Sequence, residues 1–263
     1  MMGKKPAIGV IRNMARSGGT LIGKCIGCMD GVVLLSEIHP GNLQATNPMM
    51  QAHKWFGLVT QKDLARWKQA RGPTMLQFVH TCDQRARAGG GSLVLRDWSH
   101  LDYLGRPFVE PGLGFALGEA LGGAYEIKQI CTTRHPVDQY LSMQSFPGME
   151  GMFTVGEHLR GCLAFARYAV EHGFVRYEDF TGDPDAALMR ICDAIGVRFD
   201  PGYRDRWHGY TTITGDNAQT GGRSASEKEI RSLPRKPVDP AIMDAFRACP
   251  EYGQACALLG YEE

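Results

Sequence analysis

The sequence has no apolar run of about 18 residues, so no membrane-spanning helix is expected. It also has no excess of charge of one sign, because 29 Lys and Arg residues stand against 28 Asp and Glu residues, a formal net charge of +1. This balance gives no electrostatic reason to expect nucleic acid or an anionic membrane as a partner. Internal repeats, linkers and charge blocks are missing as well. We therefore expect one domain over residues 1–263, without an integral membrane segment.

The first residues do not have the pattern of a secretory signal, because Arg12 and Asn13 interrupt a short apolar run. A cytoplasmic location is therefore expected, and there the 8 cysteines would be reduced thiols that pack as small apolar groups. Cys25 and Cys28 form a C-x-x-C pair, but no second pair or histidine partner completes a zinc pattern. No metal is expected.

The sequence does contain β-favouring segments that alternate with helical patterns. Strands are predicted at residues 7–14, from Val32 in VVLLSE, at 92–98, at 125–136 and at 173–180. Helices are predicted from Leu21 to Met29, from Pro73 to Arg87, from Pro136 to Phe146, from Glu157 to His172, from Pro184 to Ile195 and from Ala241 to Phe246 or a little beyond. Residues 47–70 are interpreted as helical or irregular, and the stretch after Trp98 as rich in turns. Residues 105–124 are interpreted as a loop or lid with a short helix, and 198–240 as a long surface loop.

This alternation favours an α/β class fold, a three-layer α/β/α arrangement with a mainly parallel central sheet. Ligands of such sheets bind beyond the carboxyl ends of the strands. The turns at 15–20, 97–102 and 132–138 are therefore expected at the same edge.

A glycine loop from Arg16 to Thr20 joins the first strand to the first helix. Glycines let backbone N–H groups approach phosphate oxygens closely, and the start of a helix favours an anion. An ordinary tight turn is the alternative. A second alternative is a Walker loop of a kinase-like enzyme, because Gly18, Gly23 and Lys24 fit G-x-x-x-x-G-K. Cys25 then stands where a hydroxyl should hold magnesium, which counts against that interpretation.

The segment ARSGGTLI resembles the P-loop-like 5′-phosphosulfate loop of the sulfotransferases that use 3′-phosphoadenosine 5′-phosphosulfate. TTRHPVDQYLSM resembles the segment whose Arg and Ser bind the 3′-phosphate in that family, VRYEDF resembles its Y-E-D segment, and GGR at 221–223 is similar to its glycine-arginine loop. The resemblance implies an O-sulfotransferase that releases 3′-phosphoadenosine 5′-phosphate and needs no metal. The donor-binding residues that it implies are Arg16, Ser17, Gly18, Gly19, Thr20, Arg134, Ser142, Tyr177, Gly222 and Arg223.

Sulfuryl transfer would be an in-line displacement in which Arg16 neutralises charge on the leaving phosphate and a general base takes the proton of the acceptor hydroxyl. Glu37 and His100 are equal candidates for the base, and His39 is the third. Asp97 is placed to orient His100. A histidine needs little tuning to act near neutral pH, whereas Glu37 would need burial.

The acceptor pocket is expected from the loops at 40–60, 99–124 and 145–156. The aromatic residues of these loops are Trp55, Phe56, Trp98, Tyr103, Phe108, Phe115, Phe146 and Phe153. They could stack on a glycan or line an apolar cleft for a lipid or another small molecule. A phosphotransferase and a non-catalytic nucleotide-binding protein remain the alternative functions, and no pattern indicates the oligomeric state.

Overall fold

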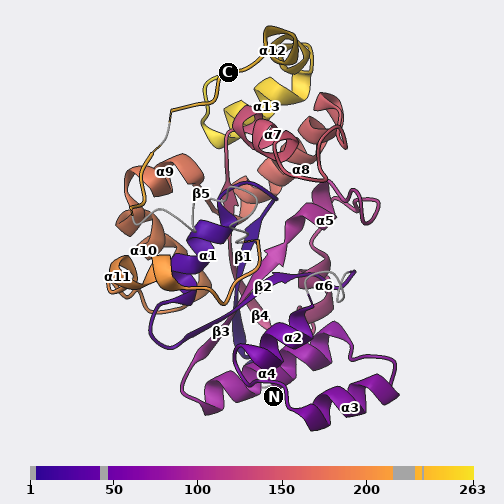
Figure 1. Cartoon of the computed structure of the whole chain (residues 1–263), viewed down its shortest axis with the longest axis vertical. Helices are drawn as coiled ribbons and strands as arrows, with labels where there is room; N and C mark the ends of the chain where they lie inside the picture. Colours follow the sequence, from indigo (N-terminus) through magenta and orange to yellow (C-terminus); the bar gives the residue numbers. More distant parts are fainter. Residues whose placement is uncertain (1–3, 42–46, 216–228, 233) are drawn as a thin grey trace.

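The computed structural model describes residues 4–41, 47–215, 229–232 and 234–263. Five strands form one sheet in the order β2-β3-β1-β4-β5 (Figure 1). The strands are β1 (Ala7–Asn13), β2 (Val32–Ile38), β3 (Ser92–Trp98), β4 (Glu126–Thr133) and β5 (Phe174–Arg176). Every neighbouring pair is parallel, so the predicted parallel sheet and α/β class are confirmed.

Helices connect these strands, and further helices follow the last strand. They are α1 (Gly19–Gly27), α2 (Pro48–Lys54), α3 (Gln61–Gln69), α4 (Met75–Ala88), α5 (Ser99–Tyr103), α6 (Ala116–Leu121), α7 (Pro136–Gln144), α8 (Val155–His172), α9 (Tyr177–Gly182), α10 (Pro184–Ile195), α11 (Tyr203–Arg206), the 3-10 helix η1 (Trp207–Gly209), α12 (Pro240–Arg247) and α13 (Pro250–Leu259). None of the described helices is long and apolar enough to span a bilayer.

Helices cover both faces of the sheet because the strand side chains alternate between two apolar clusters. Ile8 and Val10 of β1 pack in a cluster with residues of α2, α4 and α6. Ile11 packs on the opposite face in a cluster with α1 and α10. In Figure 1, α1, α9, α10 and α11 lie on the left of the sheet, and α7, α8, α12 and α13 gather at the top. The predicted three-layer arrangement is therefore confirmed.

Two predicted boundaries near the carboxyl edge are wrong. Residues 99–103 form the short helix α5 rather than a turn. The last strand ends at Arg176 instead of continuing through Asp179, because β5 pairs only with the final three residues of β4. Glu178 and Asp179 lie in the first turn of α9, where the positive end of the helix dipole favours acidic side chains.

The segment from 198 to 240 is not surface loop throughout. Tyr203 of α11 and Trp207 of η1 are buried against the face that α1 covers, so this polar, glycine-rich stretch supplies two aromatic residues to the core. The sequence interpretation also missed α13, which packs along α8. Gly222 and Arg223 lie outside the described residues.

Candidate functional site

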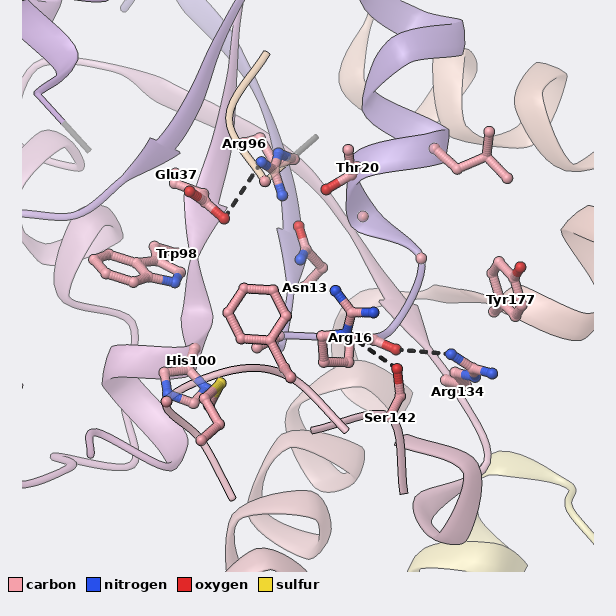
Figure 2. Close-up of a pocket in the computed structure, with 18 of the residues that line it drawn as sticks. Asn13, Arg16, Thr20, Glu37, Arg96, Trp98, His100, Arg134, Ser142 and Tyr177 are labelled. Atoms are coloured by element: carbon pink, nitrogen blue, oxygen red, sulfur yellow. Dashed lines mark hydrogen bonds and ion pairs between the residues drawn. The ribbon is translucent and has the colours of Figure 1, made fainter. Parts of the chain in front are cut away.

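A cavity of about 570 Å³ lies at the carboxyl edge of the sheet, where β1 leads into α1 (Figure 2). Every strand contributes a residue at or just beyond its carboxyl end, and these are Asn13, Glu37, Trp98, Arg134 and Tyr177. Residues of the three turns at 15–20, 97–102 and 132–138 therefore meet at one edge, as predicted. This edge includes the position where the connections from the neighbouring strands β1 and β4 leave in opposite directions, which is where open α/β sheets bind ligands.

The glycine loop has the backbone geometry of an anion site. Arg16 and Gly18 have φ values of 65° and 85°, and α1 begins directly after them at Gly19 with no side-chain cap. A side chain at Gly18 would lie 2.2 Å from the Tyr177 ring, so only glycine fits there. The uncapped first turn lines the cavity through Gly19 and Thr20, and its N–H groups carry the positive end of the helix dipole.

The Walker interpretation is not favoured by this geometry. Lys24 lies inside α1, is 1% exposed and does not line the cavity. Cys25 is fully buried, and burial raises the pKa of its thiol well above the ordinary value. The lysine and the following residue are therefore core residues of the helix rather than ligands of a nucleotide and its metal.

Arg16 and Arg134 face the cavity together without an acidic partner among the described residues. The Arg16 Nε donates a hydrogen bond to the Ser142 Oγ at 3.0 Å, and Arg134 Nη1 donates to the Arg16 carbonyl oxygen at 3.1 Å (Figure 2). Burial and the neighbouring charge of Arg134 lower the pKa of Arg16. The buried Arg134 Nε has no hydrogen-bond partner. Two uncompensated cations in one cavity are an arrangement that an anion would stabilise.

Ser17 was predicted to bind the donor and does not line the cavity, whereas Lys236 lines it and was not predicted. Ser17 is 1% exposed and does not line the cavity; its hydroxyl donates to the Met14 carbonyl oxygen at 2.7 Å and so supports the loop from below. Lys236 does line the cavity, and the sequence interpretation missed it. Its neighbour Arg235 fixes the segment through an ion pair with Asp138 Oδ2 at 3.1 Å. The adjacent cations ahead of a proline at 235–237 were the available signal.

Glu37 is directed into the cavity by an irregularity in β2. The pairing of β2 with β3 shifts register between Ser36 and Ile38, and Glu37 has a φ of 56°. Such a bulge re-aims a side chain away from the regular faces of a sheet. The Glu37 Oε1 forms an ion pair at 3.5 Å with Arg96 Nη2, and Figure 2 shows both side chains beside Thr20.

Arg96 was missed by the sequence interpretation, although a charge in the middle of the apolar strand SLVLRDW was a usable signal. It is 2% exposed, and burial lowers its pKa. Its Nη2 donates to Ser36 Oγ at 2.6 Å and to the Thr214 carbonyl oxygen at 3.0 Å. The residue therefore ties β2 to Thr214, whose neighbour Gly215 lines the cavity.

His100 lines the cavity, and one of its ring nitrogens has no hydrogen-bond partner. Its Nε2 lies 2.8 Å from the Arg106 carbonyl oxygen, which only accepts, so Nε2 carries the proton. The buried Nδ1 has no partner, and burial lowers the pKa of the ring. The expected role of Asp97 is wrong, because its Oδ2 accepts instead from Arg12 Nε at 3.1 Å and from Ser99 Oγ at 2.5 Å.

His39 is buried next to a carboxylate that pairs with Arg12, and it does not line the cavity. Its Nε2 lies 3.1 Å from Asp102 Oδ1, while Asp102 Oδ2 accepts from Arg12 Nη2 at 3.0 Å. The Arg12 guanidinium also lies 3.9 Å from the centre of the Phe115 ring and 4.3 Å from that of Tyr168. This Arg12 cluster, comprising Arg12, His39, Asp97 and Asp102 with the flanking rings, is fixed by internal partners.

The remaining cavity wall is apolar and comes from two of the three predicted loops. The region 99–124 contributes Pro107 and Phe108, and 145–156 contributes the stretch from Phe146 to Met149. No described residue of 40–60 lines the cavity, so Trp55 and Phe56 are not part of it. Of the other aromatic residues considered, Tyr103 and Phe115 contact Arg12, and Phe153 packs edge-on against His100 at 5.9 Å.

The described residues contain no group of three or more His, Cys, Asp or Glu side chains arranged to hold a metal ion.

Comparison with solved structures identifies the fold. The sulfotransferase domain from the curacin biosynthetic pathway matches with a TM-score of 0.64 at 17% identity, over 99% of each chain. The sulfotransferase domain from the Synechococcus PCC 7002 olefin synthase matches with a TM-score of 0.62 at 20% identity, over 100% of this chain and 98% of that one. Mouse sulfotransferase SULT7A1, in complex with PAP, gives 0.51 at 13% identity, over 98% and 91% of the two chains.

No protein-family model matches the chain, and no curated protein matches it by sequence. The structural likeness shows that the chain has the sulfotransferase fold, in agreement with the resemblance of its motifs.

Proposed function

We propose that this chain, which has the sulfotransferase fold, transfers a sulfuryl group from 3′-phosphoadenosine 5′-phosphosulfate to a hydroxyl of a small-molecule acceptor. The observation that carries the proposal is the pair formed by Arg16 and Arg134, two guanidinium groups in one cavity, neither of which has a carboxylate partner among the described residues. A donor with two phosphate groups supplies the missing negative charge, and guanidinium groups match phosphate oxygens in geometry. The mouse structure in complex with PAP adds support from a protein of the same fold.

We assign the donor-binding roles as the resemblance of the motifs implies. Arg134 and Ser142 hold the 3′-phosphate, and Arg16 with the first amides of α1 holds the 5′-phosphosulfate. The Tyr177 ring packs on the glycine loop and below Arg134, where it offers a face to the nucleotide. Lys236 adds a cation from the carboxyl-terminal part of the chain. Gly222 and Arg223 stay predictions about residues outside the described ranges.

The chemical step is an in-line displacement. The acceptor oxygen bonds to sulfur, the bond between sulfur and the phosphate oxygen breaks, and 3′-phosphoadenosine 5′-phosphate leaves with the negative charge that Arg16 and the α1 amides stabilise. We assign the general base to Glu37, which accepts the acceptor's proton. A methyl group at Gly215 would lie 2.9 Å from Thr20 Oγ1 and 3.5 Å from Glu37 Oε1, so the carboxylate lies close to the start of α1.

His100 is the alternative base in this proposal. The acceptor hydroxyl has one hydrogen, so the unprotonated Nδ1 takes that proton only where Glu37 does not. Because Nε2 donates to a backbone carbonyl, the ring is held in one tautomer. Arg96 positions Glu37 through their ion pair.

Binding of adenosine 3′,5′-bisphosphate, measured by isothermal titration calorimetry, tests the donor site. We expect saturable binding to the wild type and a loss of roughly 100-fold in affinity for Arg134→Ala, the size expected for removing a charged hydrogen-bonding group. Arg66→Ala, in an exposed side chain of α3, is the matched control and should bind as the wild type does. Absence of saturable binding, or equal affinity in Arg134→Ala, would overturn the proposal.

Turnover separates the proposal from its alternatives. Consumption of labelled donor in the presence of hydroxyl acceptors is expected for a sulfotransferase. Tight binding of the bisphosphate with no transfer to any acceptor would support a non-catalytic nucleotide-binding protein. Binding of ATP that depends on magnesium would support a phosphotransferase.

A further inference from the structure

The acceptor half of the cavity differs in chemistry from the donor half. We define the acceptor half by the residues that line the end of the cavity away from the donor cations. They are Glu37, Trp98, His100, Pro107, Phe108, Phe146, Pro147 and Met149. Its cationic neighbours Arg16, Arg134 and Lys236 belong to the donor half. The boundary between the halves is the Phe146 ring, whose centre lies 5.1 Å from the Arg16 guanidinium carbon.

Few groups of the acceptor half can pair with hydroxyls of a ligand. Arg96 borders it, but its Nη2 is already shared among Ser36, Thr214 and Glu37. The polar groups of this half are the Glu37 carboxylate, the His100 ring and the Trp98 indole N–H, and Asn13 and Thr20 also line the cavity. A glycan would bring several hydroxyls into the cavity, and each one without a partner costs free energy. The arrangement suits a ligand with few hydroxyls.

The charge of the acceptor half disfavours an anionic ligand. Glu37 carries the negative charge of this half. Its partner Arg96 is already shared with Ser36 and Thr214, and Arg16, Arg134 and Lys236 are used by the donor in the proposed function. A carboxylate or phosphate on the acceptor would meet a like charge at the place where its hydroxyl must bind. An uncharged acceptor avoids this repulsion.

The aromatic walls provide the surface for an apolar body. Trp98 and Phe108 lie with ring centres 5.0 Å apart at an angle of 56°, a tilted contact that forms one wall. Phe146 and Met149 come from the loop after α7 and form part of the remaining lining. Phe108 is 48% exposed, so part of its apolar surface is open to water and would be covered by a bound ligand.

We infer that the acceptor is an uncharged alcohol whose hydroxyl is carried on an apolar chain or ring, and that Phe108 and Phe146 select for it. The inference rests on the proposed function and names the acceptor class that the function leaves open. The hydroxyl donates its hydrogen to Glu37, and the apolar body contacts the rings. Removing one ring exposes the apolar ligand surface that it covered, so each alanine variant weakens binding about 10-fold.

Calorimetric titrations of the full chain with 1-octanol, 2-phenylethanol and methyl α-glucopyranoside test this inference, each with and without adenosine 3′,5′-bisphosphate. We expect at least one of the two apolar alcohols to bind, and to bind more tightly than the glucoside. Phe108→Ala and Phe146→Ala should each weaken that binding about 10-fold, and Phe108→Ala, whose ring does not contact Arg16, should leave the affinity for the bisphosphate unchanged. Val170→Ala is the matched control, because Val170 on α8 is also 48% exposed and does not line the cavity.

The outcomes distinguish this inference from the proposed function. If neither apolar alcohol binds, if the glucoside binds more tightly, or if both phenylalanine variants bind the alcohol as the wild type does, the inference is overturned. If the bisphosphate does not bind while an alcohol binds in a manner that needs Phe108 or Phe146, the apolar site stands and the proposed function fails. In turnover, a raised KM for the alcohol with kcat little changed in Phe108→Ala supports a selecting role.

Discussion

Arg12 and Arg16 are four residues apart, yet their environments are opposite. The Arg12 guanidinium pairs with Asp97 and Asp102 and is enclosed by aromatic rings. Arg16 shares the cavity with Arg134, has no carboxylate partner among the described residues, and has its pKa lowered by burial and by that second cation. The strand ends between them, and its last residue Asn13 lines the cavity.

The contrast separates structural charge from functional charge. A buried charge that is satisfied within the protein stabilises one arrangement of the chain, whereas a charge left without a counterion disfavours the empty state and stabilises a complex with an anion. Arg12 therefore belongs to the scaffold below the cavity, and Arg16 to the binding site. Arg96 is an intermediate case, because it is buried and paired but its partner Glu37 faces the cavity.

The largest effect should come from the paired arginine. Arg12→Met leaves Asp97 and Asp102 buried without their cation, and we expect the free energy of unfolding to fall by about 3–5 kcal/mol in urea titrations. Adding Asp97→Asn and Asp102→Asn should restore part of this loss, since the uncompensated charges are then removed. If the free energy of unfolding falls by less than about 1 kcal/mol in Arg12→Met, the structural role assigned to Arg12 is contradicted.

Glu37 differs from both arginines, because it is paired within the protein and is also assigned a chemical role. Glu37→Gln should lower kcat about 1,000-fold while the affinity for adenosine 3′,5′-bisphosphate stays unchanged, because the amide cannot accept the proton. Glu119→Gln, an exposed residue of α6, is the control. If His100→Ala instead causes the larger loss of kcat, the base is His100 and the ion pair with Arg96 marks Glu37 as structural.

The unpaired arginines should show the reverse of the Arg12 effect. Arg16→Ala removes a repulsion in the empty cavity, so the melting temperature without ligand should stay equal or rise. The bisphosphate at 100 times its Kd should stabilise the wild type by about 2.7 kcal/mol, and at the same concentration should stabilise the variant less. Thermal melts with and without the bisphosphate measure both quantities, and a marked loss of stability in the ligand-free variant would show that Arg16 is structural.

The smallest effect concerns the pH dependence of His100. Burial lowers the pKa of His100 below its ordinary value of 6.5, so the ring is neutral at pH 7 and becomes protonated only as the pH falls further. Protonation removes the Nδ1 lone pair, so the His100 contribution to kcat/KM for the acceptor should be constant above pH 6.5 and lost below it. Profiles of the wild type and His100→Ala isolate this contribution. An inflection above pH 6.5 that disappears in His100→Ala would contradict the assigned environment.

Much of the fold and of the donor half could be predicted because the signals are local. Proline and aspartate at 183–184 start α10, and Gly196 with a φ of 73° ends it, as the sequence indicated. The glycine loop and the Arg134 to Ser142 spacing are likewise encoded within a few residues of one another. The missed elements lacked such signals: α11 and η1 are held by burial of Tyr203 and Trp207 against distant helices.

The base and the acceptor wall could not be predicted from the sequence, because they depend on contacts between residues far apart in the chain. Asp97 and His100 are three residues apart in the sequence and were expected to interact, but Asp97 pairs with Arg12 across 85 positions. Conversely, Lys236 reaches the cavity because Arg235 pairs with Asp138 across 97 positions. Which of several possible partners a side chain contacts is decided by the three-dimensional arrangement of the chain.

The sequence by itself determined the alternation of strands and helices, the edge at which their turns meet and the cationic loop at that edge, because period, caps and glycine turns act within a few residues. Only the tertiary structure decided which charges are satisfied internally and which face the cavity. That decision depends on contacts between strands whose order in the sheet differs from their order in the chain, as with Arg96 of β3 and Glu37 of β2.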